Sequence, residues 1–211
     1  MLQNVTIKSV VKRLPMYLDY LLDTKEQDSN IKYISSKKIS DDLALGEVQV
    51  RKDLSLISGK GKPKIGYDIE SLTNTIGMYL GCNQKKKAIL IGAGKLGKAL
   101  LNFEEFTRYG IEIVTGLDLK EFEQGSAIPI LKFNEENLQR IFCENKIDIG
   151  IICVPKQEAQ HVCDILVNNG IKAIWNFAPM VLKVPKDVLV QNENLAYSLS
   201  IVSSIINQNN N

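Results

Sequence analysis

The sequence predicts an α/β protein in two parts, an N-terminal winged helix-turn-helix and a C-terminal doubly wound parallel sheet. Three observations lead to this fold class. A short apolar segment at 88–91 runs directly into three closely spaced glycines and then into a helical pattern. Short apolar strands alternate with amphipathic helices from there to residue 176. Before them, two short helical patterns flank Gly46 and are followed by a basic, glycine-rich segment at 58–67.

The closely spaced glycines predict a turn that holds the pyrophosphate of a dinucleotide. Gly92, Gly94 and Gly97 form the pattern G-x-G-x-x-G between an expected strand and an expected helix. The first glycine of such a turn permits the bend, the second lets the backbone approach the phosphates, and the third lets helix and strand pack closely. Asp118 ends the next strand pattern about 20 residues later, where an acid suits the free ribose 2′-hydroxyl of NAD. A glycine-rich turn in some other α/β domain is the plainer alternative.

The later strand patterns place further residues beside this turn. Strands are expected at 111–118, 128–131, 147–154 and 171–176, with helices at 134–145 and 159–169. Ligands of open parallel sheets bind at the carboxyl ends of the strands, so the loops after the strands should line one crevice. The cofactor-binding residues expected there are Gly92, Ala93, Gly94, Lys95, Leu96, Gly97, Asp118, Val154, Pro155, Asn176, Ala178 and Pro179.

The first part of the chain has the helical spacing of a helix-turn-helix domain. Apolar residues at i, i+3 and i+4 predict a helix over 5–23, in which Pro15 marks a kink or a new start, and then a polar loop over 24–30. A serine is expected to cap a second helix, over 35–43, and a third helix covers 47–57. Two short helices joined by a glycine-containing turn are typical of a helix-turn-helix.

The basic segment at 58–67 is predicted to form the β-hairpin wing of a winged helix. Its three lysines would bring flexible cations to DNA phosphates or to the minor groove. A basic hairpin that is merely solvated is the alternative, but the third helix lies directly before it. The DNA-binding residues that we expect are Ser36, Lys37, Gln49, Arg51, Lys52, Ser55, Lys60, Lys62, Lys64 and Tyr67.

The distribution of charge supports an anionic partner for the first part only. Residues 1–87 contain 15 Lys and Arg against 10 Asp and Glu, whereas the remainder contains 11 against 14. The whole chain has a formal net charge of +2, which by itself says little. A basic first part beside an acidic second part fits binding of a nucleic acid by the first part.

Composition excludes several classes of protein. Hydrophobic residues make up 45% of the 211, enough for a real core, yet they form no apolar run of about 18 residues that would span a membrane. Charged residues near the start argue against a signal peptide. Four cysteines without C-x-x-C spacing and a single histidine predict no metal site and a reduced, cytoplasmic setting.

The expected domains are a winged helix at 1–81, a dinucleotide-binding domain at 82–192 and a separate C-terminal helix at 193–207. A helix over 70–80 is expected to bridge the first two. The last helix is apolar over much of its surface and therefore needs burial on several sides. It could pack on its own domain or exchange into a second subunit, and the pattern alone does not decide between these.

Taken together, these segments resemble the Rex family of redox-sensing transcriptional repressors over nearly the whole chain. The residues that carry the resemblance are Arg13-Leu14-Pro15, Ile34-Ser35-Ser36, Leu45-Gly46-Glu47-Val48-Gln49-Val50-Arg51-Lys52-Asp53-Leu54, Pro63-Lys64-Ile65-Gly66-Tyr67-Asp68, Gly92-Ala93-Gly94-Lys95-Leu96-Gly97, Val154-Pro155, Ala159-Gln160, Gly170-Ile171-Lys172 and Asn176-Phe177-Ala178-Pro179. The resemblance implies a cytoplasmic homodimer with swapped C-terminal helices, a Rossmann domain that binds NADH or NAD, and release from palindromic operator DNA when NADH binds.

The resemblance also implies residue roles. Arg51 and Lys52 would lie on the recognition helix, and the segment 176–179 would approach the nicotinamide. We expect Phe103, Pro179 and Leu195 of the partner subunit to form an apolar wall around the nicotinamide ring.

One family feature is missing. Some members link the domains through an Arg, a Tyr and an Asp, and the matching positions here are Asp19, Phe103 and Asn194. That network is therefore expected to be absent as a unit, which leaves open how cofactor and DNA binding are coupled.

Three other functions compete with this interpretation. A small NAD-dependent oxidoreductase would need an acid/base beside the nicotinamide, but His161 lies inside an expected helix, no Tyr-x-x-x-Lys pair follows the strands, and no catalytic residue is predicted. A winged-helix regulator could sense another nucleotide-like ligand, such as a coenzyme A ester. A winged helix could also bind protein, although the wing lysines suit phosphates better.

Overall fold

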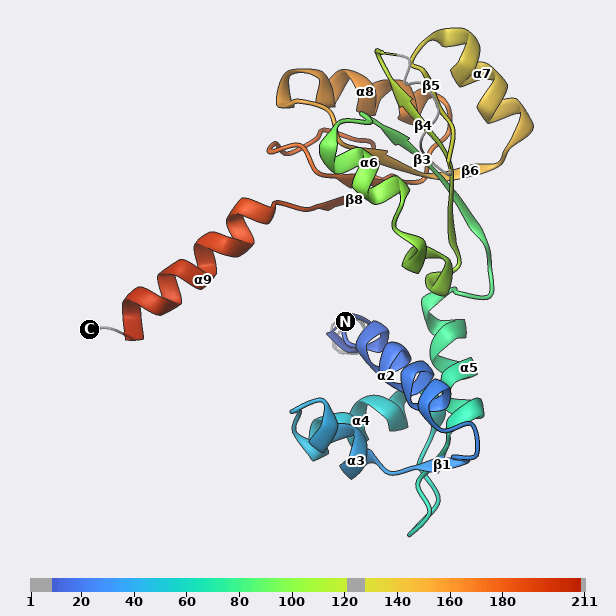
Figure 1. Ribbon diagram of the computed structural model, residues 1–211, viewed down its shortest axis with the longest axis vertical. Coiled ribbons are helices and arrows are strands. Elements are labelled where there is room, and N and C mark those ends of the chain that lie inside the picture. Colours follow the sequence, from blue (N-terminus) through green and yellow to red (C-terminus); the bar gives the residue numbers. More distant parts are fainter. Residues whose placement is uncertain (1–8, 121–127, 210–211) are drawn as a thin grey trace. The chain divides into compact units, whose positions relative to one another are not determined.

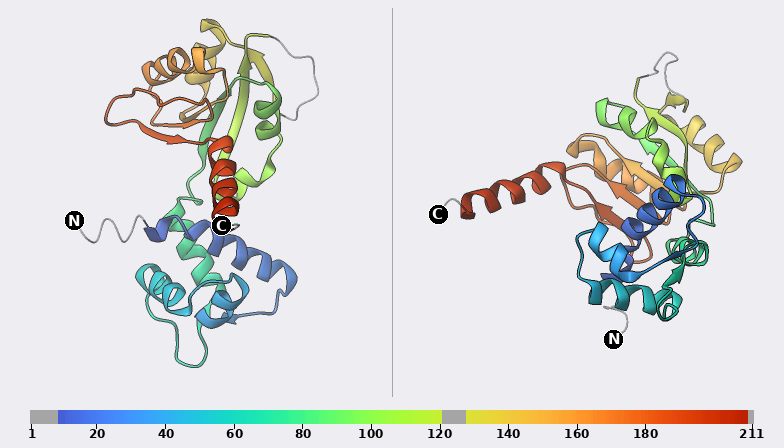
Figure 2. Two further views of the ribbon diagram at one scale, coloured as in Figure 1. Left: turned by 90° about the vertical axis from the view of Figure 1, so that its left-hand side faces the viewer. Right: turned by 60° about the horizontal axis from the view of Figure 1, so that its bottom comes forward.

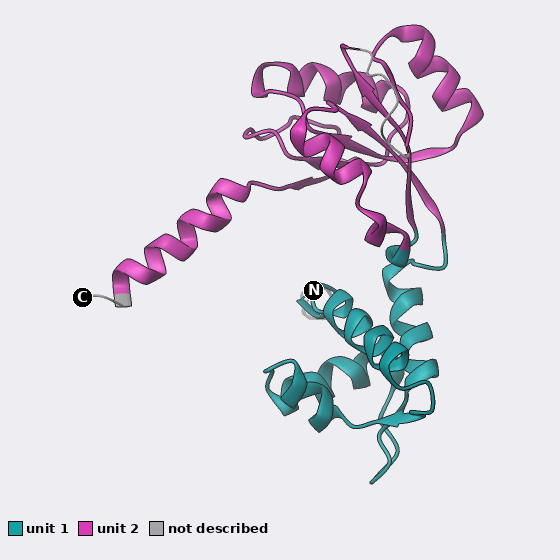
Figure 3. Cartoon of the chain, in the orientation of Figure 1, with its two compact units in different colours: residues 1–84, 108–110 teal, residues 85–107, 111–211 magenta. Residues whose placement is uncertain are grey.

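The computed structural model describes residues 9–120 and 128–209 and divides the chain into two compact units. Unit 1 consists of residues 1–84 and 108–110, and unit 2 of residues 85–107 and 111–211 (Figure 3). The change of unit at residue 84 falls three residues beyond the boundary expected from sequence. The short return of 108–110 to unit 1 was not expected. Residues 5–8 of the first expected helix lie outside the described residues.

The helices from residue 14 onward in unit 1 surround one apolar core (Figure 1). They are α2 (Leu14–Gln27), α3 (Ser36–Asp42), α4 (Glu47–Ser58) and α5 (Ile69–Leu80). Pro15 lies in the first turn of α2, where its missing N–H is not needed, so it starts this helix. The helix continues to Gln27, past the point where a polar loop was expected to begin. Ser35 caps α3 by accepting a hydrogen bond from the Lys38 N–H at 3.0 Å.

The wing of unit 1 rests on a two-stranded antiparallel sheet. Its strands are β1 (Tyr33–Ile34) and β2 (Tyr67–Asp68), and the wing before β2 is closed by an antiparallel bridge between Lys62 and Gly66. Gly66 has a φ of +96°, and a Cβ there would lie 2.2 Å from the carbonyl oxygen of Ile34. The base of the wing therefore requires glycine.

Unit 2 is built on a parallel sheet of six strands in the order β5-β4-β3-β6-β7-β8. The strands are β3 (Lys86–Ile91), β4 (Ile111–Asp118), β5 (Ile130–Lys132), β6 (Ile147–Ile152), β7 (Ala173–Asn176) and β8 (Leu189–Asn192). The helical elements are α6 (Lys95–Leu101), the 3-10 helix η1 (Glu104–Tyr109, which ends in unit 1), α7 (Glu135–Glu144), α8 (Lys156–Asn168) and α9 (Leu195–Asn209). This strand order is that of a Rossmann fold, and it confirms the predicted fold class. Strand β8 and η1 were not predicted.

Helices cover both faces of this sheet, with α6 on one face and α7 and α8 on the other (Figures 1 and 2). The side chains of β3 alternate accordingly. Ala88 and Leu90 belong to the core that includes Leu101 of α6, whereas Ile89 and Ile91 belong to the core that includes α7 and α8. Because both faces are buried, the strand has the continuous apolar sequence from which it was predicted.

Helix α9 buries none of its described side chains in this chain. Its exposed large apolar residues are Leu195, Tyr197, Leu199, Ile201, Val202, Ile205 and Ile206, each more than half exposed. Among the described residues, no helix combines the length and apolar character needed to cross a membrane.

Candidate dinucleotide crevice and nucleic-acid interface

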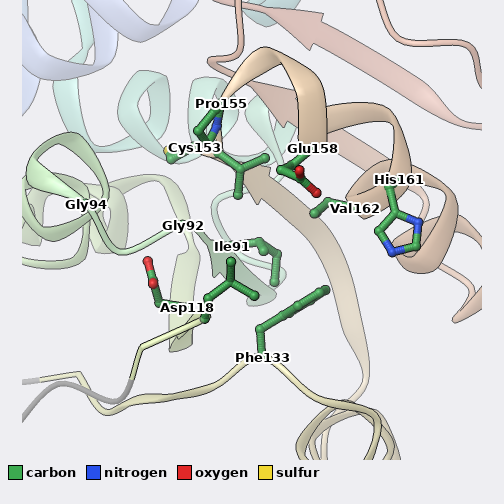
Figure 4. A pocket seen from close by; sticks show the side chains of 12 residues that line it. Ile91, Gly92, Gly94, Asp118, Phe133, Cys153, Pro155, Glu158, His161 and Val162 are labelled. Atoms are coloured by element: carbon green, nitrogen blue, oxygen red, sulfur yellow. The ribbon is translucent and has the colours of Figure 1, made fainter.

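A cavity of about 670 Å³ opens at the carboxyl ends of β3 and β6 (Figure 4). The sheet order reverses between these neighbouring strands, and a doubly wound sheet binds its ligand at such a switch point. The residues that line the cavity are Ile91, Gly92, Gly94, Asp118, Leu119, Phe133, Cys153, Val154, Pro155, Glu158, His161 and Val162. Gly92, Gly94, Asp118, Val154 and Pro155 were expected from the sequence.

The three glycines perform different structural tasks in this turn. Gly92 has a φ of +99°, and a Cβ there would lie 2.7 Å from the carbonyl carbon of Cys153. A Cβ on Gly97 would lie 2.0 Å from the carbonyl oxygen of Gly92, so only glycine lets α6 pack this closely on the turn. A Cβ on Gly94 would meet no atom within 4 Å. Gly94 therefore leaves open space beside the backbone, as a phosphate would require.

Asp118 lies beside the glycine turn, at the end of β4 (Figure 4). One of its carboxylate oxygens accepts the Ala93 N–H at 2.7 Å, and the other accepts the Lys120 N–H at 3.1 Å. A carboxylate can accept about four hydrogen bonds, so Asp118 keeps capacity for two further donors such as ribose hydroxyls. The two backbone contacts hold this carboxylate at the mouth of the turn.

The segment 176–179 was expected at the crevice, but it supplies none of the residues that line the cavity. Asn176 is fully buried, and its amide nitrogen donates to the carbonyl oxygens of Ala178 and Met180 and to the Asn192 Oδ1, at 3.2, 2.9 and 2.8 Å. Its amide oxygen accepts the Ala178 N–H at 3.0 Å. These bonds fix the loop after β7 to β8, whereas Pro179 at its tip is exposed.

Sequence reasoning missed the contribution of α8 to the cavity. Glu158, His161 and Val162 line it, although the sequence placed His161 only inside an expected helix and gave it no part in the crevice. Positions 158, 161 and 162 are three and four apart and therefore share one helix face. That spacing, directly after Pro155 at the end of a strand, is the signal that could have identified them. Phe133, which follows β5, carried no comparable signal.

Four aromatic rings form a continuous row in unit 2. The centroids of Phe103 and Phe106 are 5.0 Å apart, those of Phe106 and Trp175 5.7 Å, and those of Trp175 and Phe177 4.5 Å, all edge to face. The row joins η1 to the loop after β7. Phe103 itself is about half exposed and lies at the open end of the row.

The surface of α4 and the wing exposes the cations that are expected to contact nucleic acid. Arg51, Lys52 and the three wing lysines are exposed, and so is Lys37 on α3. The Arg51 guanidinium is held by Glu47, one turn earlier, at 2.8 Å. Val48 on the same helix is 60% exposed, which gives α4 an apolar contact beside its cations. Ser36 and Ser55 are partly exposed, and Ser55 hydrogen-bonds the Arg51 carbonyl oxygen.

Two residues expected at the DNA are engaged elsewhere. Tyr67 is only 8% exposed and packs in the core of unit 1, so its ring does not extend from the wing. The Gln49 amide nitrogen donates to the Asp53 carboxylate at 2.7 Å. Tyr67 is therefore buried away from the surface, whereas Gln49 remains exposed with its amide nitrogen bonded to Asp53.

Asp53 is the centre of a buried polar network that fixes α4 to α2. Arg13 binds its carboxylate with two bonds of 2.6 and 2.9 Å, and the Tyr17 hydroxyl donates to it at 2.8 Å. Burial alone would raise the pKa of Asp53, but the hydrogen bonds from Arg13, Tyr17 and Gln49 outweigh it and lower the pKa. The carboxylate is therefore charged at neutral pH and fully bonded.

The described residues include no cluster of His, Cys, Asp and Glu that could hold a metal. All four cysteines are unpaired. Burial raises the pKa of Cys153 to about 12, so this thiol at the cavity stays protonated at neutral pH and is a poor nucleophile.

Comparisons with known proteins agree with this geometry. Residues 8–55 match a family described as a putative DNA-binding protein N-terminus, and residues 83–180 match a CoA binding domain family. The redox-sensing transcriptional repressor Rex of Clostridium perfringens strain 13 is 39% identical over 202 residues, which cover 95% of this chain and 94% of that protein. Rex of Clostridioides difficile strain 630 is 38% identical, with 99% of each chain covered.

Solved structures extend the likeness to three dimensions. RSP, a Rex-family repressor, in complex with β-NAD+ and operator DNA is 37% identical with a TM-score of 0.85, over 96% of this chain and 93% of that one. RSP in complex with β-NADH has a TM-score of 0.80, over 96% and 94%. The likeness confirms the family that the sequence motifs indicated: the chain belongs to the Rex family of redox-sensing transcriptional repressors.

Proposed function

We propose that this chain is a DNA-binding repressor that senses the ratio of NADH to NAD and leaves its operator when NADH binds. It is a regulator rather than an enzyme. The observation that carries the proposal is the likeness of nearly the whole chain to the solved Rex-family repressor RSP. The same solved repressor has been captured with β-NAD+ and operator DNA and with β-NADH. This chain has a cavity for the nucleotide, and exposed cations on α4 and the wing for the DNA.

The dinucleotide would bind with its pyrophosphate on the backbone between Gly92 and Gly97. A phosphate would take the open space beside Gly94, where Lys95 and Leu96 begin α6. Asp118 would accept hydrogen bonds from the adenosine ribose, and it would repel the 2′-phosphate of NADP. Val154 and Pro155 form the opposite edge of the crevice. We therefore expect NADH to bind much more tightly than NADPH, with calorimetry of both nucleotides as the measurement.

The nicotinamide would lie toward the aromatic row and the loop at 176–179. Reduced and oxidised nicotinamide differ by one positive charge, so an apolar wall favours the neutral NADH ring. We propose that Phe103, Pro179 and Leu195 of the partner subunit form this wall. Replacing Leu195→Asp should then weaken NADH binding more than NAD binding, whereas equal losses for the two nucleotides would rule out this wall.

The dimer would be held in part by α9. Its row of exposed apolar side chains needs a partner surface, and a swap between two copies would supply it. A twofold dimer presents two α4 helices to one face of palindromic DNA, with half-sites about 34 Å apart in successive major grooves. We propose a homodimer in the cytoplasm, where such DNA and reduced thiols are found.

Regulation would be a shift between two arrangements of the dimer. Only one of them would place both α4 helices in successive grooves, and NADH must bind the other arrangement more tightly, or it would shift nothing. Fluorescence anisotropy of a labelled palindromic duplex, selected from a random library by the nucleotide-free protein, tests this at fixed salt. NADH should release the duplex while NAD leaves it bound. Tight DNA binding that neither nucleotide alters would refute the sensing function.

The match to a CoA binding domain family favours one second candidate, a regulator of the same architecture that senses a coenzyme A ester. Adding coenzyme A and acetyl-coenzyme A to the same anisotropy assay separates the two. Release by these compounds at concentrations where NADH has no effect would favour the second candidate.

A further inference from the structure

We propose that η1 and Gly110 form a lever that transmits the state of the nicotinamide side of unit 2 to helix α2 of unit 1. This inference rests on the proposed function. The lever would replace the Arg–Tyr–Asp network that links the domains in some family members, which Asp19, Phe103 and Asn194 cannot form. The lever is a single short stretch of chain, Phe103 to Gly110, whose two ends are bound in different units.

The first end of the lever is held by aromatic contacts within unit 2. Phe106 lies between Phe103 and Trp175, with centroid distances of 5.0 and 5.7 Å. Trp175 in turn meets Phe177, in the loop proposed to approach the nicotinamide. Packed edge-to-face rings have few alternative arrangements, so a ligand that moves Phe103 or Phe177 must also move Phe106.

The second end is held by polar contacts within unit 1. The Tyr109 hydroxyl donates to the Asp19 Oδ2 at 2.6 Å, and Tyr109 also packs on the core of unit 1. The Arg108 guanidinium meets Asp23 at 3.3 Å and Glu26 at 3.4 Å. The three acids follow one another at i, i+4 and i+7 and so form one stripe along α2. Exposed ion pairs contribute little, so the half-buried Tyr109 bond is the main attachment.

Gly110 shows that this attachment is built into the backbone. It has a φ of +70°, and a Cβ there would lie 2.5 Å from the carbonyl oxygen of Cys82. Cys82 lies just after the end of α5. Residues 108–110 therefore contact the chain at the C-terminal end of α5 as well as α2. The chain enters unit 1 after Thr107 and returns to unit 2 at Ile111, the first residue of β4.

The path then reaches the recognition helix. Tyr17 of α2, half a turn from Asp19, and Arg13 before the helix both bind Asp53 of α4. A displacement of the acidic stripe of α2 is therefore transmitted to α4 through the hydrogen bonds that Arg13 and Tyr17 donate to the Asp53 carboxylate. The positioning residues of this device are Tyr109 and Asp19, with Arg108 in support.

The test is the nucleotide response of DNA affinity in a Tyr109→Phe variant. The quantity measured is the ratio of the duplex Kd with NADH to the Kd without nucleotide, by anisotropy with the library-selected duplex. Loss of one charge-assisted hydrogen bond should lower this ratio about threefold to tenfold. The Kd for DNA without nucleotide and the Kd for NADH without DNA should each stay within about twofold of the original protein. Tyr79→Phe, which changes a half-exposed tyrosine of α5, is the matched control and should leave the ratio unchanged.

A charge exchange keeps the inference testable if one variant folds poorly. Arg108→Glu should lower the ratio, and adding Asp23→Arg should restore part of it, which a merely structural loss would not do. In a double-mutant cycle, Asp19→Asn and Tyr109→Phe should be non-additive in the ratio. An unchanged ratio in Tyr109→Phe, in a protein whose original form does respond to NADH, overturns the lever alone. No response in the original protein overturns the proposed function and the lever together.

Discussion

The two units position their functional elements by opposite means. In unit 1, α4 is fixed to α2 by side chains, because Arg13, Tyr17 and Gln49 all donate to the buried Asp53 carboxylate. In unit 2, the nucleotide turn is fixed by the absence of side chains, because Gly92 and Gly97 allow backbone atoms to come within contact distance. A charged network can be weakened in steps by substitution or by acid. At Gly92 and Gly97 the backbone leaves no room for an added atom, which gives sharper predictions.

The largest effects are expected in the cradle. Gly97→Ala forces a methyl group against the Gly92 carbonyl oxygen and should destabilise unit 2 by about 2–3 kcal/mol as well as abolish nucleotide binding. Gly94→Ala adds its methyl group to open space, so the melting temperature should hardly change while NADH affinity falls about 100-fold, or about 2.7 kcal/mol. Thermal unfolding and NADH titration of both variants check this. Loss of stability in Gly94→Ala would contradict the assignment of that space to a phosphate.

The next effect, a loss of stability without a loss of nucleotide binding, is expected in the charged network. Asp53→Ala leaves the Arg13 guanidinium without its carboxylate and the Tyr17 hydroxyl without its acceptor. The cost should be about 2–4 kcal/mol in the unfolding of unit 1, because Arg13 is 28% exposed and regains some water. Urea unfolding followed by circular dichroism measures it, and NADH binding to unit 2 serves as the control. An unchanged midpoint would mean that apolar packing alone holds α4.

Smaller effects separate base reading from phosphate binding on the surface of unit 1. Arg51→Ala should cost about 1–3 kcal/mol with the selected operator but much less with random DNA, if this guanidinium leaves Glu47 to read a base. Lys64→Ala in the wing should weaken binding to all duplexes alike and lower the salt slope by about one. Anisotropy titrations at several salt concentrations measure both. If Arg51→Ala lowers the affinity for every duplex equally, Arg51 contacts a phosphate rather than a base.

The smallest effect is expected from acid. The pKa of Asp53 is lowered in the folded state, so its contribution to stability is complete above its unfolded pKa of about 3.8 and is lost as pH falls through the lower folded pKa. The contribution of Asp53 to the free energy of unfolding should therefore be the same at pH 7 and at pH 5. Below about pH 4 the original protein should lose stability faster than Asp53→Asn, which has no carboxylate to protonate. Parallel curves below pH 4 would contradict the charged state of Asp53.

The sequence predicted those parts of the molecule that depend on local rules. Period and turn chemistry located β3, the glycine turn, Asp118 and the helices on either side of Gly46, because each is decided by residues close together in the chain. The polar residues at 24–27 predict a loop by their composition. Helix α2 nevertheless extends to Gln27, because these residues include no glycine or proline that would end a helix.

The parts that were missed depend on contacts between distant residues. Asp53 looked like an ordinary helical acid, and its partner Arg13 lies 40 positions away. The place of Tyr67 after a basic hairpin predicts a DNA contact, but Tyr67 lies in β2, which pairs with β1, and its ring is buried in the core. Strand β8 is exposed on three of its four residues, so it lacked the apolar pattern of the other strands. The return of residues 108–110 to unit 1 left no trace in composition or spacing.

The central claim is that the crevice of unit 2 and the α4 surface of unit 1 are thermodynamically coupled. Linkage makes this coupling reciprocal, so the most direct measurement is the Kd of NADH with and without saturating operator duplex. The account predicts that the duplex weakens NADH binding by the same factor by which NADH weakens duplex binding, and that NAD shows no such loss. Equal NADH affinities with and without the duplex would contradict the account, however tightly each ligand bound alone.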